Sequence, residues 1–133
     1  MKFINLTPHS IVFYAPSAIE GNDERHTYTL KEGAKPVVVL ESADVARAEQ
    51  RAIPAGQMSV NGCPVSVFRM EYGEPVNLPD MWEEGDDVYY IVSYLTAAAA
   101  QASGRGTNDL FMVAQTVRDK DGHIVGCAAL SQL

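Results

Sequence analysis

Short apolar and β-branched runs recur along the chain, and residues that favour turns separate them. Residues 2–6 and 10–14 predict two strands around a turn at Thr7-Pro8-His9, because Pro8 pushes the residue before it out of helical space. The Pro-Val-Val-Val-Leu run at 36–40 predicts a buried strand. Further strands are expected at residues 25–30, 58–60, 64–70, 73–79 and 88–92, with loops at 15–25 and 31–35.

The middle of the chain contains the strongest hairpin signal. Asn61-Gly62 predicts a two-residue turn that joins residues 58–60 to residues 64–70. Pro54 and Gly56 are expected to break the chain before it. Residues 41–52 are ambiguous, since alanine, glutamate and arginine favour helix but the apolar spacing is weak, and we favour an extended segment.

The last third of the chain predicts one helix and a hairpin. Ser93 can cap a helix at about residues 94–103, and Gly104 follows where a left-handed residue ends it. After residues 109–112, two strands at 115–118 and 123–129 are joined through Asp119-Lys120-Asp121-Gly122. The predicted fold is therefore α+β in a single domain, residues 1–133: a mostly antiparallel sheet of eight or nine strands, one helix and a C-terminal β-hairpin.

Composition and charge narrow the class of protein. With 47% hydrophobic and 20% charged residues, the chain can bury a core. A net charge of −7 argues against DNA or RNA as a partner, because lysine and arginine supply most of that affinity. Cys63 and Cys127 form no CxxC pair and predict two reduced thiols. No signal peptide and no membrane helix are predicted, so we expect a cytoplasmic protein.

Several clusters of reactive side chains have simpler explanations, and we expect no cofactor, metal or catalytic residue. A calcium loop starting at Asp119 would need glycine at its sixth position and glutamate at its twelfth, where Ile124 and Leu130 stand. His123 and Cys127 are four residues apart on a predicted strand, about 13 Å along it, and cannot touch. The acidic run at 83–87 is interpreted as a solvated loop, and His9 as a turn residue.

The segment from Tyr89 to Arg118 is the best candidate for a ligand site. Glycines flank Arg105, which allows close approach of a ligand, and Arg105 and Arg118 can contact phosphate. Thr107, Asn108 and Asp109 can hydrogen-bond ribose hydroxyls, Tyr89, Tyr90 or Tyr94 can stack on a base, and Gln101 ends the helix nearby. Arg25 and Arg69 could add to a local positive pocket. Equally open is that Arg118 pairs with a neighbouring carboxylate and Arg105 is exposed.

Motifs at both ends of the chain resemble a widespread family of small phage and prophage proteins. They are Asn5-Leu6-Thr7-Pro8-His9, Tyr90-Ile91-Val92-Ser93, Asp109-Leu110, and Val117-Arg118-Asp119 followed by Gly122, Ile124, Gly126 and Cys127. The likeness spans nearly the full chain, although residues 15–88 match only in general character. The family is similar to the first-described Thoeris anti-defence proteins, which sequester cyclic ADP-ribose isomers and in some members cyclic oligonucleotides.

The resemblance implies a β-sheet with helical additions, assembled as a dimer or a trimer of dimers in the cytoplasm of an infected or lysogenic bacterium. Ligand would be enclosed near subunit interfaces and captured without hydrolysis. An arginine of the family matches Arg118, and aromatic and amide contacts would fall around Tyr94 and Gln101.

Three functions remain open from the sequence. A nucleotide-signal sponge fits the Arg105–Asp109 loop, because capture needs arginines and stacking surfaces but no activated nucleophile. A phage accessory module would instead bind a host protein through a sheet edge or an apolar patch, with no small-molecule ligand. A nucleotide-processing enzyme would use His123, His26 or Asp109 as general base, and the missing catalytic motifs disfavour it.

Overall fold

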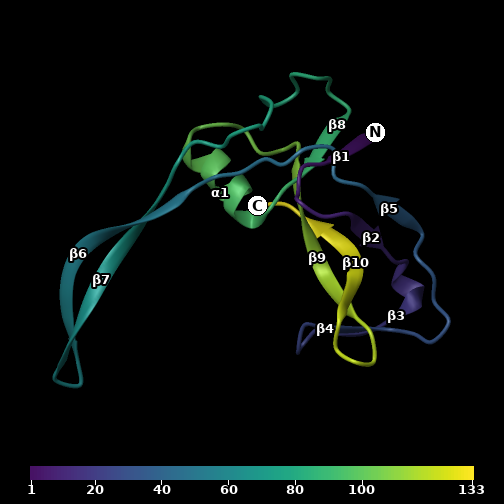
Figure 1. Ribbon diagram of the computed structural model, residues 1–133, viewed down its shortest axis with the longest axis horizontal. Helices are drawn as coiled ribbons and strands as arrows, with labels where there is room; N and C mark the ends of the chain where they lie inside the picture. Colours follow the sequence, from purple (N-terminus) through teal and green to yellow (C-terminus); the bar gives the residue numbers. More distant parts are fainter.

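A computed structural model describes residues 1–133 and contains ten strands and one α-helix (Figure 1). A short 3-10 turn at Pro16–Ala18 precedes the third strand. The helix is α1 (Tyr94–Ala102). The strands are β1 (Lys2–Asn5), β2 (Ile11–Phe13), β3 (Ile19–Asn22), β4 (Thr27–Leu30), β5 (Val38–Leu40), β6 (Gln50–Val60), β7 (Cys63–Tyr72), β8 (Val88–Ile91), β9 (Leu110–Arg118) and β10 (Ile124–Ser131).

The body of the protein is a mixed, barrel-like sheet that is nearly closed. Its strands follow the order β1-β8-β9-β10-β2-β5, and the β3-β4 pair joins it through β9. Four pairings are parallel, namely β1 with β8, β8 with β9, β4 with β9 and β2 with β10. The expectation of a mostly antiparallel sheet is therefore confirmed only in part: the sheet is mixed, because segments far apart in the sequence run side by side in the same direction.

The two N-terminal strands form as predicted but do not pair with one another. β1 lies beside β8, whereas β2 lies between β10 and β5. The turn at residues 7–9 therefore carries the chain from one edge of the barrel-like sheet toward the other, and it does not close a hairpin.

Helix α1 confirms the local signals that predicted it. The Ser93 hydroxyl accepts a hydrogen bond from the Thr96 amide at 3.2 Å, and Gly104 follows the helix with a φ of 89°. Ala97 and Ala100 are fully buried against the sheet. Their small side chains let the helix lie close to the strands beneath it.

The core lies on both faces of the central strands, as the alternation of side chains along a strand requires. Val88 and Tyr90 of β8 face α1, together with Leu110. Ile91 points to the opposite face, where it packs with Ile11 and Cys127. No helix in the structure has both the length and the apolar character needed to cross a membrane.

β6 and β7 form a long arm, residues 50–72, that extends from the body as a separate two-stranded sheet (Figure 1). Its tip confirms the predicted turn, since Asn61 and Gly62 both have positive φ, 51° and 81°. Pro54 does not break the strand as expected. β6 instead continues through a bulge between Pro54 and Gln57, which takes up the extra residue.

Three further expectations are corrected by tertiary structure. The predicted loop at 15–25 contains β3, where Gly21 leaves room for the Tyr28 ring of the neighbouring strand. The run at 36–40 is an edge strand, with Val38 and Val39 about half exposed instead of buried. Residues 73–79 make only one isolated bridge, from Val76 to Arg47.

Candidate functional site: a groove at the start of helix α1

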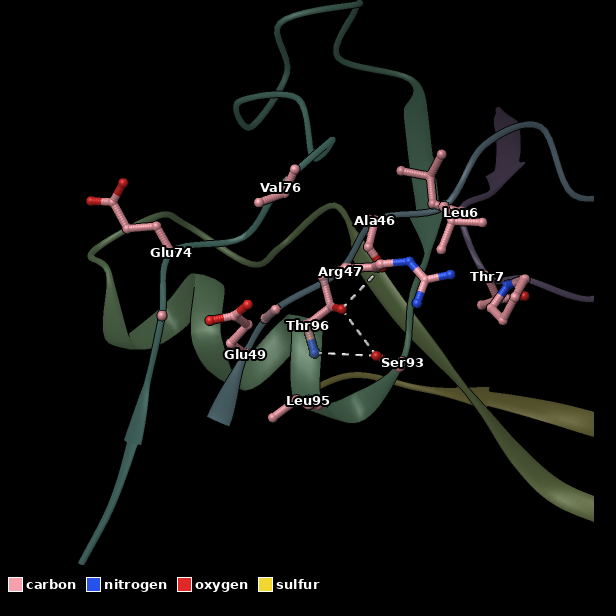
Figure 2. A pocket seen from close by; sticks show the side chains of 14 residues that line it. Leu6, Thr7, Ala46, Arg47, Glu49, Glu74, Val76, Ser93, Leu95 and Thr96 are labelled. Atoms are coloured by element: carbon pink, nitrogen blue, oxygen red, sulfur yellow. Dashed lines mark hydrogen bonds between the residues drawn. The ribbon is translucent and has the colours of Figure 1, made fainter. Parts of the chain in front are cut away.

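A cavity of about 800 Å³ lies where the arm joins the body beside the first turn of α1 (Figure 2). It is an open groove with walls from four parts of the chain: the turn after β1, the segment before β6, the segment after β7, and the helix start. The lining residues are Leu6, Thr7, Pro8, Val45, Ala46, Arg47, Ala48, Glu49, Gly73, Glu74, Val76, Ser93, Leu95 and Thr96.

Asn5 fixes the shape of the first wall. Its buried side-chain amide donates to the carbonyls of His9 and Leu40, at 2.8 and 3.0 Å. The Asn5 side-chain oxygen Oδ1 accepts hydrogen bonds from the Thr7 amide at 2.9 Å and from the Thr7 hydroxyl at 2.6 Å. His9 takes part only through its backbone oxygen, so the interpretation of this motif as a turn is confirmed.

The second wall couples the helix start to the segment before the arm. The hydroxyls of Ser93 and Thr96 lie 3.0 Å apart, and Thr96 Oγ1 donates to the Ala46 carbonyl at 3.4 Å. The Ala46 amide in turn donates to the Leu6 carbonyl at 3.0 Å. The first turn of a helix has free N–H groups and a partial positive charge, so this wall favours anions.

Arg47 supplies a formal positive charge to the groove. Its backbone exchanges two hydrogen bonds with Val76, at 3.0 and 2.7 Å, which fixes where its side chain begins. The guanidinium itself makes no hydrogen bond or ion pair in the structure. In Figure 2 it extends toward Thr7, whereas the carboxylates of Glu49 and Glu74 lie toward the arm. One end of the groove can therefore hold an anion and the other can accept hydrogen bonds from hydroxyls.

Arg105 and Asp109, both predicted to contact ligand, bind each other instead of lying free. Arg105 Nη1 and Nη2 donate to the two Asp109 carboxylate oxygens at 2.8 and 2.9 Å. Arg105 also donates to the carbonyls of Pro79 and Gly106. The Asp109 side chain is fully buried, and that of Arg105 is only 10% exposed. Asp109 holds the Arg105 side chain in place, and the hydrogen bonds of Arg105 to Pro79 tie the loop after α1 to the loop before β8.

Three more of the predicted residues lie on α1 or the loop after it. Tyr94 is 65% exposed and free to stack on a ligand, and Gln101 is exposed at the other end of the helix. Because they are seven residues apart, they share one helix face about 10 Å apart along the axis. Thr107 is half-buried in the loop. None of the three lines the groove, although Tyr94 follows Ser93 directly.

Arg118, Arg25 and Arg69 lie on other parts of the protein. Arg118 is exposed at the far end of β9, where Nη1 donates to the Gly122 carbonyl at 2.8 Å. Arg25 lies in the exposed turn between β3 and β4, and Arg69 lies on the arm. Within one chain these arginines do not converge on a single cavity.

Two further tyrosines considered for base stacking are held within the protein. Tyr90 is 2% exposed and donates its hydroxyl hydrogen to Glu84 at 2.8 Å. Burial, and then this hydrogen bond, raise the pKa of Tyr90 well above its ordinary value. Tyr89 packs in an aromatic cluster, with ring centroids 5.4 to 5.6 Å from those of Phe3, Trp82 and Phe111. Of the three tyrosines, only Tyr94 is free to contact a ligand.

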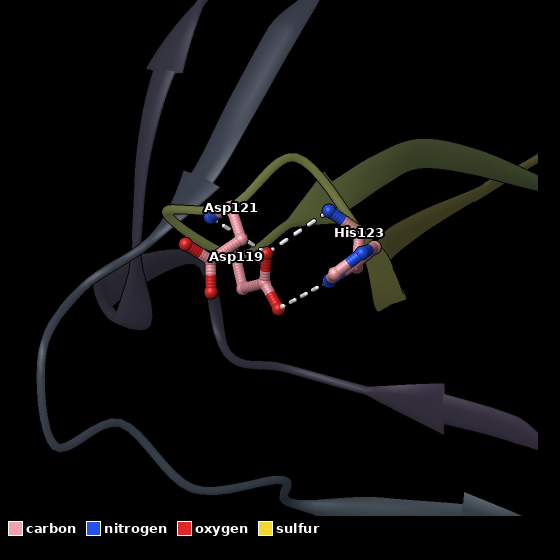
Figure 3. A group of neighbouring side chains, drawn as sticks. All are labelled: Asp119, Asp121 and His123. Carbon is pink, nitrogen blue, oxygen red and sulfur yellow. Dashed lines mark hydrogen bonds and ion pairs between the residues drawn. The ribbon is translucent and has the colours of Figure 1, made fainter.

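The C-terminal motif shapes the β9–β10 turn. Asp119 Oδ1 accepts hydrogen bonds from the amides of His123 and Asp121, both at 2.9 Å (Figure 3). These backbone hydrogen bonds, that from His123 first, lower the pKa of Asp119. The carboxylates of Asp119 and Asp121 and the His123 ring gather at this exposed turn. One oxygen or nitrogen atom of each, of the kind that can bind a metal ion, lies within 4.8 Å of the other two. An aspartate that accepts hydrogen bonds from following backbone amides stabilises a turn, so we interpret these three residues as part of the β9–β10 turn.

Gly126, a second residue of the C-terminal motif, also has a structural role. A Cβ at this position would collide with the Val12 carbonyl oxygen and the Tyr14 ring, so only glycine allows β2 to approach β10. The next residue, Cys127, is buried in the core, and burial raises the pKa of its thiol. The residues that carry the resemblance are thus largely architectural.

Arg47 is the functional candidate that sequence reasoning missed. It is one of six arginines and lies in an ambiguous segment, and no local pattern marks it. Only the crossing of residues 45–49 over the helix start brings it into the groove.

Searches against protein-family models, curated proteins and solved structures find no match for this chain.

Proposed function

We propose that this protein captures a small nucleotide-like anion, a cyclic ADP-ribose isomer or a related cyclic nucleotide, and holds it without cleaving it, as a phage-encoded anti-defence sponge. The observation that carries the proposal is the unpaired Arg47 guanidinium in the 800 Å³ groove. The volume lies within the range of small-molecule sites. The motifs at both chain ends, which resemble those of phage-encoded sponges, support the same class of ligand.

The groove offers a distinct partner for each part of a nucleotide. Arg47 and the start of α1 suit a phosphate, because a guanidinium forms charge-assisted hydrogen bonds and helix N–H groups attract anions. Glu49 and Glu74 can accept hydrogen bonds from ribose hydroxyls. Val76 and Leu95 provide apolar surface for a base. Tyr94 stands beside the same helix start and can stack from outside.

The first experiment is a thermal-stability and calorimetric titration of the purified protein with cyclic ADP-ribose isomers and cyclic di- and trinucleotides. A ligand present at a hundredfold its Kd adds about 2.7 kcal/mol of stability, which raises Tm by several degrees. Ligand released by denaturation is then compared with the input by mass spectrometry. Intact ligand in a fixed ratio to protein supports capture, and a converted product would overturn it.

Two matched arginine variants locate the site. Arg47→Ala removes one charge-assisted contact, worth about 1.5–3 kcal/mol, and is expected to weaken binding roughly 10- to 100-fold without changing Tm of the free protein. Arg118→Ala removes an exposed arginine outside the groove and is expected to bind as the unmodified protein does. Loss of binding in Arg118→Ala alone would move the site to the β9–β10 turn.

A second candidate function, binding of a host protein without a small-molecule ligand, is favoured by the β5 edge. β5 ends the sheet order and pairs only with β2, so its outer backbone groups are unpaired. Val37, Val38 and Val39 are 48–61% exposed along it. An extended peptide could add to this edge as a further strand. A flat response to every nucleotide, with loss of host-protein capture in Val38→Pro, would favour this function.

A further inference from the structure

The arm, residues 50–72, presents more apolar surface than a solvated hairpin should. Two groups of large side chains are exposed on it. The tip group is Met58, Val60 and Val65, at 65%, 54% and 42%, and the base group is Phe68, Met70 and Tyr72, at 54%, 46% and 36%. A lone two-stranded hairpin is at best marginally stable in water, and apolar patches of several hundred Å² mark interaction sites.

The register of the arm places these groups on opposite faces. Met58 pairs with Val65, so the tip group shares one face. Phe68 is an odd number of positions from Val65 along the uninterrupted β7 strand, so the base group, at alternate positions from Phe68, points the other way. Arg51 and Glu71, which pair with each other, lie on the face opposite the base group. Each end of the arm thus has one apolar face.

We propose that two copies of this chain associate through their arms, laid antiparallel so that the tip group of each covers the base group of the other. The arm provides both halves of this contact, and a twofold axis repeats it, which is the condition for a closed, self-complementary dimer. At about 35 Å, the arm is long enough to keep tip and base contacts separate. The twist of a two-stranded ribbon lets a partner arm meet the two faces in turn.

The area involved suits a second copy. Covering the tip and base groups of both arms removes on the order of 1,000 Å² from water, and the backbone around them brings the contact toward the roughly 1,200–2,000 Å² of a stable interface. At the base of the arm, Arg51 and Glu71 lie on the face opposite the covered base group and stay in solvent. The proposal concerns the arm alone and stands whether or not the groove binds a nucleotide.

The test uses two arm variants and their mixture, measured by light scattering and sedimentation over a range of concentrations. The unmodified protein is expected at twice the 14.5 kDa of one chain. Met58→Ser with Val65→Ser, and separately Phe68→Ser with Met70→Ser, should each weaken association at least 100-fold. An equimolar mixture of the two variants should dimerise again, because one tip-to-base contact in the mixed dimer is intact. Contact of tip with tip would give no such recovery.

Cysteine cross-linking checks the geometry in protein with an unmodified apolar surface. Cys63 lies exposed at the tip, and Ala52 pairs with Met70 on the base-group face. Ala52→Cys should form an intermolecular disulfide with Cys63, whereas Arg51→Cys, on the other face, should not. A monomer at all concentrations, a dimer unaffected by both double variants, or a Cys63–Cys63 disulfide in the unmodified protein would each overturn the proposal.

Discussion

The Arg105–Asp109 pair should dominate the stability of the loops around helix α1. Asp109→Asn keeps the size of the side chain but removes the charge that faces a guanidinium only 10% exposed. The guanidinium would keep its hydrogen bonds to the carbonyls of Pro79 and Gly106. Of its two contacts to Asp109, at 2.8 and 2.9 Å, one would lose its acceptor to an amide NH2 group and the other would lose the negative charge of the acceptor. The buried positive charge then lacks a compensating negative charge.

The expected loss of folding stability follows from the burial of the Arg105–Asp109 pair. Removing one partner of a buried ion pair costs about 3–5 kcal/mol, a large part of the roughly 5–15 kcal/mol by which a domain is stable. For a chain of this size, 1 kcal/mol lowers Tm by about 3–5 °C, so Tm should fall by about 9–25 °C. Replacing both partners, as in Arg105→Met with Asp109→Leu, should cost less than Asp109→Asn alone, because no charge remains buried.

Urea unfolding followed by circular dichroism measures this loss. The control is Glu71→Gln, which removes an exposed ion pair with Arg69 at 3.8 Å and should change stability by less than about 0.5 kcal/mol. A change below about 1 kcal/mol in Asp109→Asn would refute the reasoning, since it would mean that water or a rearranged backbone replaces the carboxylate.

Three further predictions test other parts of the structure. Gly126→Ala should cost about 1–3 kcal/mol, because its Cβ meets the Val12 carbonyl, whereas Gly73→Ala, with no neighbour closer than 3.7 Å, should be nearly neutral in urea unfolding. A thiol reagent should label the exposed Cys63 in the native protein but reach Cys127, buried and with a raised pKa, only in denaturant; equal labelling rates would contradict its placement in the core. The raised pKa of Tyr90 keeps this side chain protonated in the folded state, so its contribution to stability is complete below pH of about 10 and falls by up to about 1.4 kcal/mol per pH unit above it, as the unfolded chain ionises. In a pH series of unfolding free energies, Tyr90→Phe should make the alkaline slope shallower and leave the part that comes from the raised pKa values of Cys127 and Tyr28; an unchanged slope would contradict the burial of the Tyr90 hydroxyl.

Short-range features of this protein could be predicted from its sequence because neighbouring residues create them. The Ser93 cap and Gly104 delimit α1, the positive φ angles of Asn61 and Gly62 suit the turn they form, and the turn beginning at Asp119 joins β9 to β10. A side chain within three or four positions satisfies the backbone groups in two of these cases, so no distant contact is needed.

Tertiary structure alone decided which strands distant in the sequence pair with one another and which residues make up the site. Parallel pairing of β1 with β8 joins segments more than eighty residues apart, and no local signal records it. The spacing of Arg105 and Asp109 could suggest a pair, but only burial by the loop at Pro79 turns these residues from ligand candidates into a structural link. Arg47 enters the groove only because distant segments meet beside α1, since convergence of charges is a property of packing and not of spacing along the chain.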